Sequence, residues 1–277
     1  MAKIKLILMD MDGTLLNSEQ KISSDNIRAI CHAQENGIRI GLCSGRGPGD
    51  LITFVHNSNL HDIALLTMNG TFCLENEYAE PFASFLLPED TLRETERILQ
   101  QEDVCYECFC LNQLAIRQSS RKEFFARWAP DENNHHSYAC KITFDEAGLQ
   151  EARKSGVHKI IAIFYDEEKR RLVYDRLNRL GKLDIASSWV DNCELMPLGH
   201  GKGSAVLQLG KRLNIQPDEI MTIGDQDNDL SMFTCGAIGV AMANASPVIK
   251  AAAKLHTLSN DENGVAYAIE HFAIQER

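Results

Sequence analysis

The sequence predicts a doubly wound α/β fold, in which a mostly parallel sheet carries an inserted α+β unit. Apolar runs typical of buried parallel strands alternate with helical patterns in the first third of the chain, and the same alternation returns in the last third. Between them, from about Pro88, the pattern changes to hairpin-like strands and helices. The chain has 277 residues, a length that allows one large domain or two smaller ones, and the change of pattern favours two.

The first third of the chain begins with a strand over residues 5–9, whose sequence KLILM is nearly continuous in apolar side chains. Ser23 or Ser24 can cap a following helix, and Gly37 ends it. The elements expected next are a strand over 38–43, a helix over 50–56, a strand over 63–67 and a turn at Asn69-Gly70. Strands joined by helices in this way favour a parallel sheet.

The middle of the chain, residues 84–189, is expected to form the α+β insert. Its predicted elements are a helix over 88–101, strands in VCYECFCL and QLAIR, helices over 121–128 and 145–154, a strand over 158–165, a helix over 167–180 and a strand over 183–189. The first pattern then returns, with a helix over 203–213, strands over 219–223 and 238–241, and a helix over 247–253. Residues 1–83 and 190–277 are therefore expected to form one core around the insert.

The composition narrows the possible partners. A formal net charge of −11 disfavours nucleic acid and anionic membranes, since both require a basic surface. A small anionic substrate is still possible, because a metal ion, one lysine and backbone N–H groups supply enough local positive charge. The apolar N-terminal run is broken by Asp10 and Asp12 before it resembles a signal peptide or reaches the roughly 20 residues of a membrane span. Nine cysteines without a disulfide framework suit a reducing compartment, so we expect a cytoplasmic protein.

Asp10 and Asp12 follow the first predicted strand directly, in DMDGTLL. Ligands of doubly wound sheets bind at the carboxyl ends of the strands, so both carboxylates are candidates for chemistry. Hydrolysis of a phosphate monoester requires a nucleophile, a proton donor for the leaving alkoxide and cations on the transferring group. Two neighbouring aspartates can divide the first two tasks. Alone, however, an Asp-x-Asp-Gly segment is more often an acidic turn or a fragment of a calcium loop.

Three further segments strengthen the functional interpretation. Asp225 and Asp229 lie in GDQDND after another predicted strand, so a second carboxylate cluster can hold Mg²⁺ between loops. Ser44 and Gly45 also follow a strand, where a hydroxyl and an N–H group suit a phosphate oxygen, although a plain turn is equally common there. Lys202 stands between two glycines at a helix start, where its ammonium can reach a shared anion.

These segments resemble, in this order, the four motifs of the haloacid dehalogenase-like phosphatases: DMDGTLL, SGR, GKG and GDQDND. The insert, the Asn69-Gly70 turn and the closing stretches ELMPLGHGKGSAVLQL and SNDENGVAYAIEHF are similar to those of the Cof-type hydrolases, which carry a large α+β cap. The resemblance implies a magnesium-dependent phosphatase of small phosphate monoesters, such as sugar or other metabolite phosphates. It also implies that the insert is a cap that sets substrate specificity.

The resemblance implies a role for each site residue. Asp10 would attack phosphorus to give an aspartyl-phosphate, and Asp12 would protonate the leaving alcohol and then activate water. Mg²⁺ would be held by the Asp10 carboxylate, the Asp12 backbone carbonyl and Asp225. Asp229 would support either the metal or Lys202. The residues expected to contact the phosphate are Ser44, Gly45, Lys202 and Asn228.

Two alternative functions are open at this point. A phosphomutase of hexose phosphates has similar motifs and a similar cap, and would return the phosphoryl group rather than hydrolyse the aspartyl-phosphate. A binding protein would use the pocket to sense a sugar phosphate without turnover, although the presence of Asp10, Asp12, Lys202 and Asp225 together argues against it. Arg46, in the SGR segment, is expected to pack against the loop and the cap rather than to contact substrate.

Overall fold

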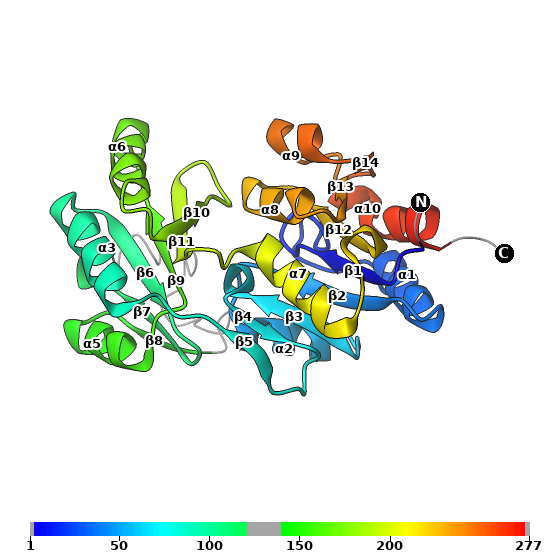
Figure 1. The fold of residues 1–277 in the computed structure, drawn as a ribbon, viewed down its shortest axis with the longest axis horizontal. Helices are drawn as coiled ribbons and strands as arrows, with labels where there is room; N and C mark the ends of the chain where they lie inside the picture. Colours follow the sequence, from blue (N-terminus) through cyan, green and yellow to red (C-terminus); the bar gives the residue numbers. More distant parts are fainter. Residues whose placement is uncertain (1–2, 121–139, 275–277) are drawn as a thin grey trace.

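The computed structural model describes residues 3–120 and 140–274, and these residues form two units, each built on one sheet. The larger sheet has eight strands in the order β14-β13-β12-β1-β2-β3-β4-β5, and the smaller has six in the order β10-β11-β9-β6-β7-β8. Figure 1 shows the two units side by side along the longest axis of the molecule. Each unit has its own cluster of buried apolar side chains, as expected for two separately packed cores.

The larger sheet is parallel through its centre. β1 (Leu6–Met9) pairs in parallel with β2 (Arg39–Cys43) on one side and with β12 (Ile220–Gly224) on the other. The remaining strands are β3 (Ile63–Thr67), β13 (Ile238–Ala241) and β14 (Leu255–His256), which are parallel, and β4 (Phe72–Leu74) and β5 (Pro81–Ser84), which are antiparallel. The chain starts in the middle of the sheet and adds strands toward both edges, which confirms the predicted doubly wound class.

Helices cover both faces of this sheet, and Figure 1 shows α7 in front of it and α2 behind it. The helices are α1 (Ser24–Glu35), α2 (Pro48–Asn57), α7 (Lys202–Leu213), α8 (Leu230–Thr234), α9 (Pro247–Ala252) and α10 (Gly264–Ala268). At the start of α1 the Ser23 side chain accepts a hydrogen bond from the Asn26 N–H, and Asn214 ends α7 in the left-handed conformation. Shorter helical turns are η1 (Met68–Gly70), η2 (Gln118–Ser120), η3 (Pro217–Glu219), η4 (Asp227–Asp229), η5 (Asn260–Glu262) and η6 (Ile269–Ala273).

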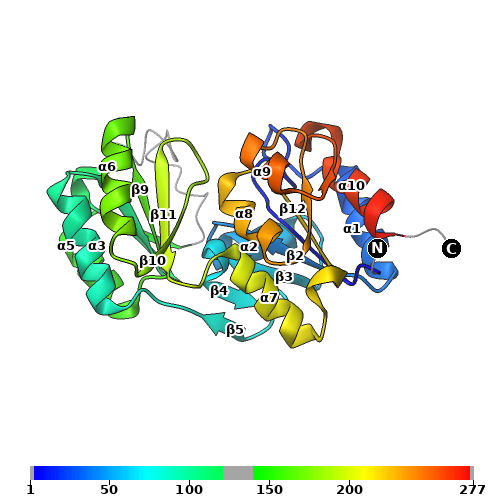
Figure 2. The same cartoon turned by 45° about the horizontal axis from the view of Figure 1, so that its top comes forward.

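The smaller unit is an α+β layer that interrupts the larger one in the sequence. Its strands are β6 (Cys105–Phe109), β7 (Gln113–Ile116), β8 (Lys141–Thr143), β9 (Lys159–Ile163), β10 (Leu183–Ala186) and β11 (Asn192–Pro197). Its described helices are α3 (Glu89–Gln101), α5 (Glu146–Ser155) and α6 (Glu167–Asn178). Figures 1 and 2 show these helices on the side of the sheet away from the larger unit. The other face of the smaller sheet is therefore turned toward the larger unit.

Most of the predicted helices and strands lie within two residues of the observed bounds, although β10 ends at Ala186 rather than at residue 189. The predicted helix over 121–128 lies outside the described residues. The sequence prediction lacks β11, which pairs with β9 and β10 in the smaller sheet even though residues from 190 onward are assigned to the core. We therefore propose that the chain leaves the smaller unit after Pro197. In the described part of the chain, no helix combines the length and apolarity that crossing a membrane requires.

Candidate active site

The carboxyl ends of three neighbouring strands bring the predicted site residues to one edge of the larger sheet. Asp10 follows β1, Ser44 follows β2 and Asp225 follows β12. The Asp10 N–H donates to the Ile223 carbonyl at 3.0 Å, which continues the β1–β12 pairing up to this edge. Side chains that are far apart in the sequence therefore share one site, at the position where doubly wound folds bind ligands.

Lys202 is the first residue of α7 and lies between two carboxylates. Its Nζ is 2.7 Å from Asp10 Oδ1 and 2.6 Å from Asp229 Oδ1. The Lys202 and Asp229 side chains are fully buried, and the Asp10 side chain is 8% exposed. Burial favours the neutral form of an amine, but the two carboxylates outweigh it and raise the pKa of Lys202 well above its ordinary value. Lys202 therefore stays charged and holds the two carboxylates together.

Hydrogen bonds fix the carboxylates of Asp225 and Asp229 as well. Asp229 Oδ2 accepts from the backbone N–H groups of Asp225 and Gln226, at 2.9 and 3.1 Å. The Asp225 carboxylate accepts from the Thr14 hydroxyl at 2.7 Å and from the Gln226 side chain at 3.2 Å. Because Lys202 already binds Oδ1 of Asp229, both oxygens of that carboxylate are occupied. This arrangement favours a supporting role for Asp229.

The three buried carboxylates form a cluster with excess negative charge. Asp10, Asp225 and Asp229 each place one oxygen within 4.8 Å of the others. Burial raises the pKa of Asp10 well above its ordinary value, with Lys202 opposing it and the neighbouring carboxylates adding to it. Burial and Asp229 together raise the pKa of Asp225 to about 7. A buried set of hard oxygen donors with too little positive charge fits a divalent cation such as Mg²⁺, which would lower both pKa values.

Gly13 makes room for this cluster beside β1. Its φ of +80° lies in the left-handed region, which favours glycine, and a Cβ at this position would be 2.4 Å from Asp225 Oδ2. The Gly13 carbonyl accepts a hydrogen bond from Asn244 Nδ2 at 2.8 Å, which holds the turn in place. The glycine of the Asp-x-Asp-Gly segment is therefore required by the backbone conformation and by the approach of the second carboxylate loop.

Two of the residues expected to contact phosphate are buried beside the cluster. Ser44 is 1% exposed, its N–H donates to the Leu66 carbonyl at 2.9 Å, and its Oγ accepts from the Arg46 N–H at 3.2 Å. Asn228 is 8% exposed, and its Oδ1 has no hydrogen-bond partner among the residues that the structure describes. A buried unpaired acceptor is costly, so the Asn228 amide is a candidate for contact with a ligand, an ion or water.

The Asp12 carboxylate binds Arg46 and is not one of the three clustered carboxylates. Arg46 donates from Nε to Asp12 Oδ2 at 2.9 Å and from Nη2 to Oδ1 at 2.5 Å. Its Nη2 also donates to Gln20 Oε1 at 3.0 Å. Two parallel hydrogen bonds of this kind fix the orientation of the carboxylate. The expected contact of Asp12 with a metal ion, through its backbone carbonyl, stays a prediction.

Several contacts at the site are absent from the sequence prediction: Thr14 with Asp225, Arg46 with Asp12, and a buried Lys159–Glu194 ion pair on the smaller sheet. Thr14 directly follows the Asp-x-Asp-Gly segment, and Lys159 is the charged first residue of an otherwise apolar strand, so both residues had a local signal. The contact between Arg46 and Asp12 had no local sequence signal, because it depends on side-chain rotamers rather than on sequence spacing.

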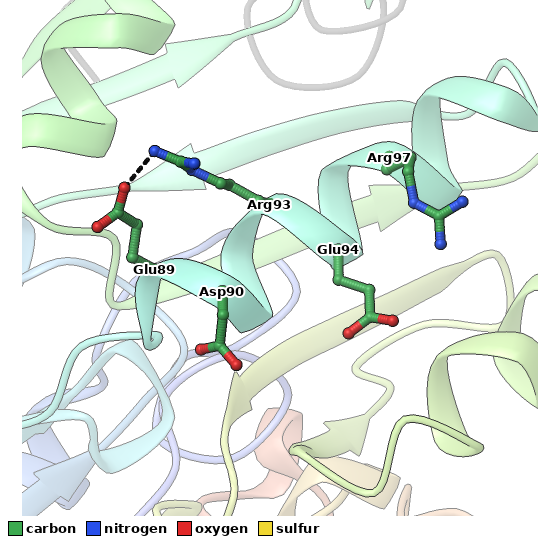
Figure 3. Close-up of a pocket in the computed structure, with 5 residues that line it drawn as sticks. All are labelled: Glu89, Asp90, Arg93, Glu94 and Arg97. Atoms are coloured by element: carbon green, nitrogen blue, oxygen red, sulfur yellow. Dashed lines mark hydrogen bonds and ion pairs between the residues drawn. The ribbon is translucent and has the colours of Figure 1, made fainter.

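A hollow of about 690 Å³ lies outside this site, along the exposed surface of α3. Figure 3 shows its lining residues on one helix, with the ion pair between Glu89 and Arg93 drawn; the full set is Glu89, Asp90, Arg93, Glu94 and Arg97. Asp90 also pairs with Lys182 at 2.9 Å. Figure 2 shows α3 on the side of the smaller sheet that faces away from the larger unit. These charges are typical of a solvated helix surface.

Comparison with protein families and curated proteins finds relatives over almost the whole chain. The family model described as haloacid dehalogenase-like hydrolase matches residues 7–269. The 5-amino-6-(5-phospho-D-ribitylamino)uracil phosphatase YwtE of Bacillus subtilis is 29% identical over 282 residues, covering 96% of this chain and 97% of the relative. The HMP-PP phosphatase of Yersinia enterocolitica is 26% identical over 275 residues, covering 97% of this chain and 95% of the relative.

Comparison with solved structures supports the fold over the whole chain. A haloacid dehalogenase-like hydrolase from B. subtilis superposes with a TM-score of 0.86 and 27% identity, covering 97% of this chain and 100% of that one. The similarity therefore includes both the larger and the smaller unit.

Proposed function

The chain belongs to the haloacid dehalogenase-like hydrolases and is a phosphatase of small phosphate substrates. From that premise we propose that it hydrolyses phosphate monoesters of sugars or related metabolites. The proposed reaction depends on Mg²⁺ and uses Asp10 as the nucleophile. The observation that carries the proposal is the buried constellation at the carboxyl edge of β1. Lys202 holds the Asp10 carboxylate at 2.7 Å, and Asp225 and Asp229 lie beside it. Hydrolysis through an aspartyl-phosphate with a divalent cation requires this combination of a fixed carboxylate nucleophile and a cation-binding cluster.

The carboxylate cluster suits Mg²⁺. We assign the metal to the Asp10 carboxylate, the Asp12 backbone carbonyl and Asp225. Asp229 is the weaker candidate for direct contact, because Lys202 and two backbone N–H groups already use its oxygens. When bound, Mg²⁺ supplies positive charge that offsets the negative charge of the transferring phosphoryl group.

The chemical steps belong to the two aspartates. Asp12 first takes up a proton, which requires it to give up at least one of its two hydrogen bonds from Arg46. The Asp10 carboxylate attacks phosphorus, the bond from phosphorus to the leaving oxygen breaks, and Asp12 gives its proton to that oxygen, so the alcohol leaves and an aspartyl-phosphate remains. Asp12, now ionised, takes a proton from water as the water attacks phosphorus. Inorganic phosphate leaves and the Asp10 carboxylate is restored. Throughout, the groups that would bind the phosphate oxygens are Ser44, Gly45, Lys202 and Asn228.

The smaller unit acts in this proposal as a cap over the site. Its sheet faces the larger unit, and Lys159 of β9 donates a hydrogen bond to the Gly45 carbonyl at 2.7 Å. A cap that closes over the substrate excludes water during phosphoryl transfer and admits it afterwards. Nine free cysteines support the further proposal that the enzyme works in a reducing compartment such as the cytoplasm.

A Mg²⁺-supported screen of phosphorylated metabolites tests the proposal. The panel should hold hexose phosphates, nucleotides, pyridoxal phosphate and the phosphoribityl-aminouracil named for the Bacillus relative, ranked by kcat/KM from phosphate release. Release from at least one sugar or metabolite monoester is the expected result. Interconversion of hexose phosphate isomers without release would establish a phosphomutase instead. Binding of the same compounds without turnover would establish a sensor.

A further inference from the structure

An ion pair between two strands of the smaller sheet is buried at its boundary with the larger unit. Lys159 lies on β9 and Glu194 on the neighbouring β11, with Lys159 Nζ 3.0 Å from Glu194 Oε2. Their side chains are 1% and 3% exposed. Burying two charges is costly unless their remaining hydrogen-bonding groups are also satisfied, and an apolar pair would pack at least as well. The partners of this ion pair therefore indicate what it does.

Both charged groups contact loops of the larger unit. Lys159 Nζ donates to the Gly45 carbonyl at 2.7 Å, and Glu194 Oε2 accepts a hydrogen bond from Asn69 Nδ2. Asn69 has a left-handed φ of 60°, and its backbone N–H donates to the Ser44 carbonyl at 2.9 Å. The ion pair thus holds the two loops that meet at the expected phosphate position, one directly and one through Asn69.

The Glu194 carboxylate is built to stay ionised in this buried position. Burial alone would raise its pKa, but Lys159, Ser188 and Asn69 outweigh burial and lower the pKa below its ordinary value. The Ser188 hydroxyl donates to Oε1 at 2.5 Å, so both oxygens of Glu194 are used. Of the three side chains that donate to this carboxylate, Lys159 and Ser188 belong to the smaller unit and Asn69 to the larger one.

The fit over Gly45 is close. A Cβ at this position would lie 3.2 Å from Lys159 Nζ, 3.2 Å from Asn69 Oδ1 and 3.4 Å from Glu194 Oε2. The polar groups of Lys159, Asn69 and Glu194 therefore converge on the Ser44–Gly45 loop, which is expected to bind the phosphate. Since Lys159, Glu194 and Asn69 are all buried, their structure favours an action through the loop over direct contact with a leaving group.

We propose that Lys159 and Glu194 are positioning residues, whose ion pair fixes the Ser44–Gly45 backbone when the cap lies on the core and so couples cap closure to phosphate binding. The inference rests on the proposed function, because that function assigns Ser44 and Gly45 to the phosphate. Lys159 and Glu194 touch no reacting atom. They act on every substrate alike, because they hold the loop that receives the phosphoryl group and not the leaving group.

The test compares the full-length protein with three variants, in the presence of Mg²⁺. Lys159→Met removes the donor to Gly45. The double variant Lys159→Met/Glu194→Gln removes both charges, so that it leaves no unpaired buried charge if the single variant does not fold. Lys182→Met is the matched control, because Lys182 pairs with Asp90 on the outer surface of the cap. The readouts are kcat and KM for p-nitrophenyl phosphate and for a hexose phosphate, and the affinity for inorganic phosphate by calorimetry.

We expect the two interface variants, Lys159→Met and Lys159→Met/Glu194→Gln, to bind inorganic phosphate roughly 100-fold more weakly than the wild type. Their kcat/KM should fall by a similar factor for both esters, since misplacing a binding loop by about 1 Å has effects of this size. The control should match the wild type. Unchanged phosphate affinity in a folded interface variant would overturn the inference. So would a loss confined to the hexose phosphate, which would make the pair a substrate-recognition site. If the wild type hydrolyses no ester, the proposed function fails, and calorimetry with inorganic phosphate still decides the positioning role.

Discussion

Lys202 and Asp10 are 192 residues apart in the chain and form a buried ion pair, with Nζ 2.7 Å from Oδ1. The same ammonium bonds to Asp229 at 2.6 Å, so a single cation serves two carboxylates at the end of β1. This relationship orients the Asp10 carboxylate before any substrate arrives. It also makes the stability of the core depend on the site.

Replacing Lys202 with Met should destabilise the protein. The change leaves two buried carboxylates without their cation, and breaking a buried pair in this way costs about 3–5 kcal/mol in the free energy of unfolding. Urea denaturation measures the change. Lys211→Met, at an exposed position of the same helix, should unfold as the wild type does. Equal stability of the Lys202→Met protein would contradict a structural role for the pair.

Removing the metal should abolish activity reversibly. Chelation with EDTA should stop hydrolysis of p-nitrophenyl phosphate, and excess Mg²⁺ should restore it, because the carboxylate cluster lacks enough positive charge of its own. Asp225→Asn should raise the Mg²⁺ concentration for half-maximal activity at least about tenfold. Asp227→Asn, at an exposed position in the same loop, provides the control. An unchanged Mg²⁺ requirement in Asp225→Asn would exclude Asp225 as a ligand.

Asp12→Asn should lower kcat for alkyl phosphates by about 10²–10⁴-fold, because the leaving alkoxide loses its proton donor. For p-nitrophenyl phosphate, the rate of aspartyl-phosphate formation should fall less than it does for an alkyl phosphate, because the nitrophenolate leaving group needs less protonation. Single-turnover measurements on both esters separate the two steps. Near-normal turnover of the alkyl ester would show that another group supplies the proton.

Sequence patterns were sufficient for five strands of the larger sheet, which are β1, β2, β3, β12 and β13, but not for β4, β5 and β14. The apolar runs of β1 and β12 end in acidic residues, and because the carboxyl ends of parallel strands meet at one edge, the meeting of Asp10 with Asp225 follows from the fold class. β11 had no such signal: its sequence NCELMP mixes polar and apolar residues, and its place depends on pairing with β9 and β10.

Contacts across the boundary between the units could not be predicted. The hydrogen bond from Lys159 to the Gly45 carbonyl depends on how the smaller sheet lies against the larger unit, and no sequence spacing encodes that relation. The ion pair between Asp12 and Arg46 depends on the rotamers of two side chains that are about 40% exposed. The charged Lys159 at the start of the apolar strand β9 was a local signal for such a contact, but no sequence pattern indicated its partners.

Stability should fall in mildly acidic solution because of His158. This residue is 1% exposed, and its Nδ1 lies 2.9 Å from the Phe85 carbonyl. Burial lowers the pKa of His158 below its ordinary value of 6.5, although contacts with the backbone of Phe85 and Thr71 oppose the shift. The unfolded chain therefore binds the proton more tightly. The contribution of His158 to stability is complete above pH 6.5 and is lost as the pH falls through the folded-state pKa.

Urea midpoints at about pH 7.5 and about pH 5.5 measure this effect. His158→Asn keeps a donor near the Phe85 carbonyl but does not titrate, so its midpoint should change less between the two conditions. His61→Asn, at a position 72% exposed, should keep the wild-type dependence. An identical pH dependence in His158→Asn and the wild type would assign the loss of stability to other groups.

Replacing Asp10 with Asn tests the central claim most directly, with hydrolysis of p-nitrophenyl phosphate in Mg²⁺ as the measurement and circular dichroism as the check on folding. The amide preserves the shape of the side chain but is not a nucleophile. We expect a loss of at least about 10³-fold in kcat with the fold intact. A folded Asp10→Asn protein that hydrolyses the ester at the wild-type rate would contradict the assignment of Asp10 as the nucleophile.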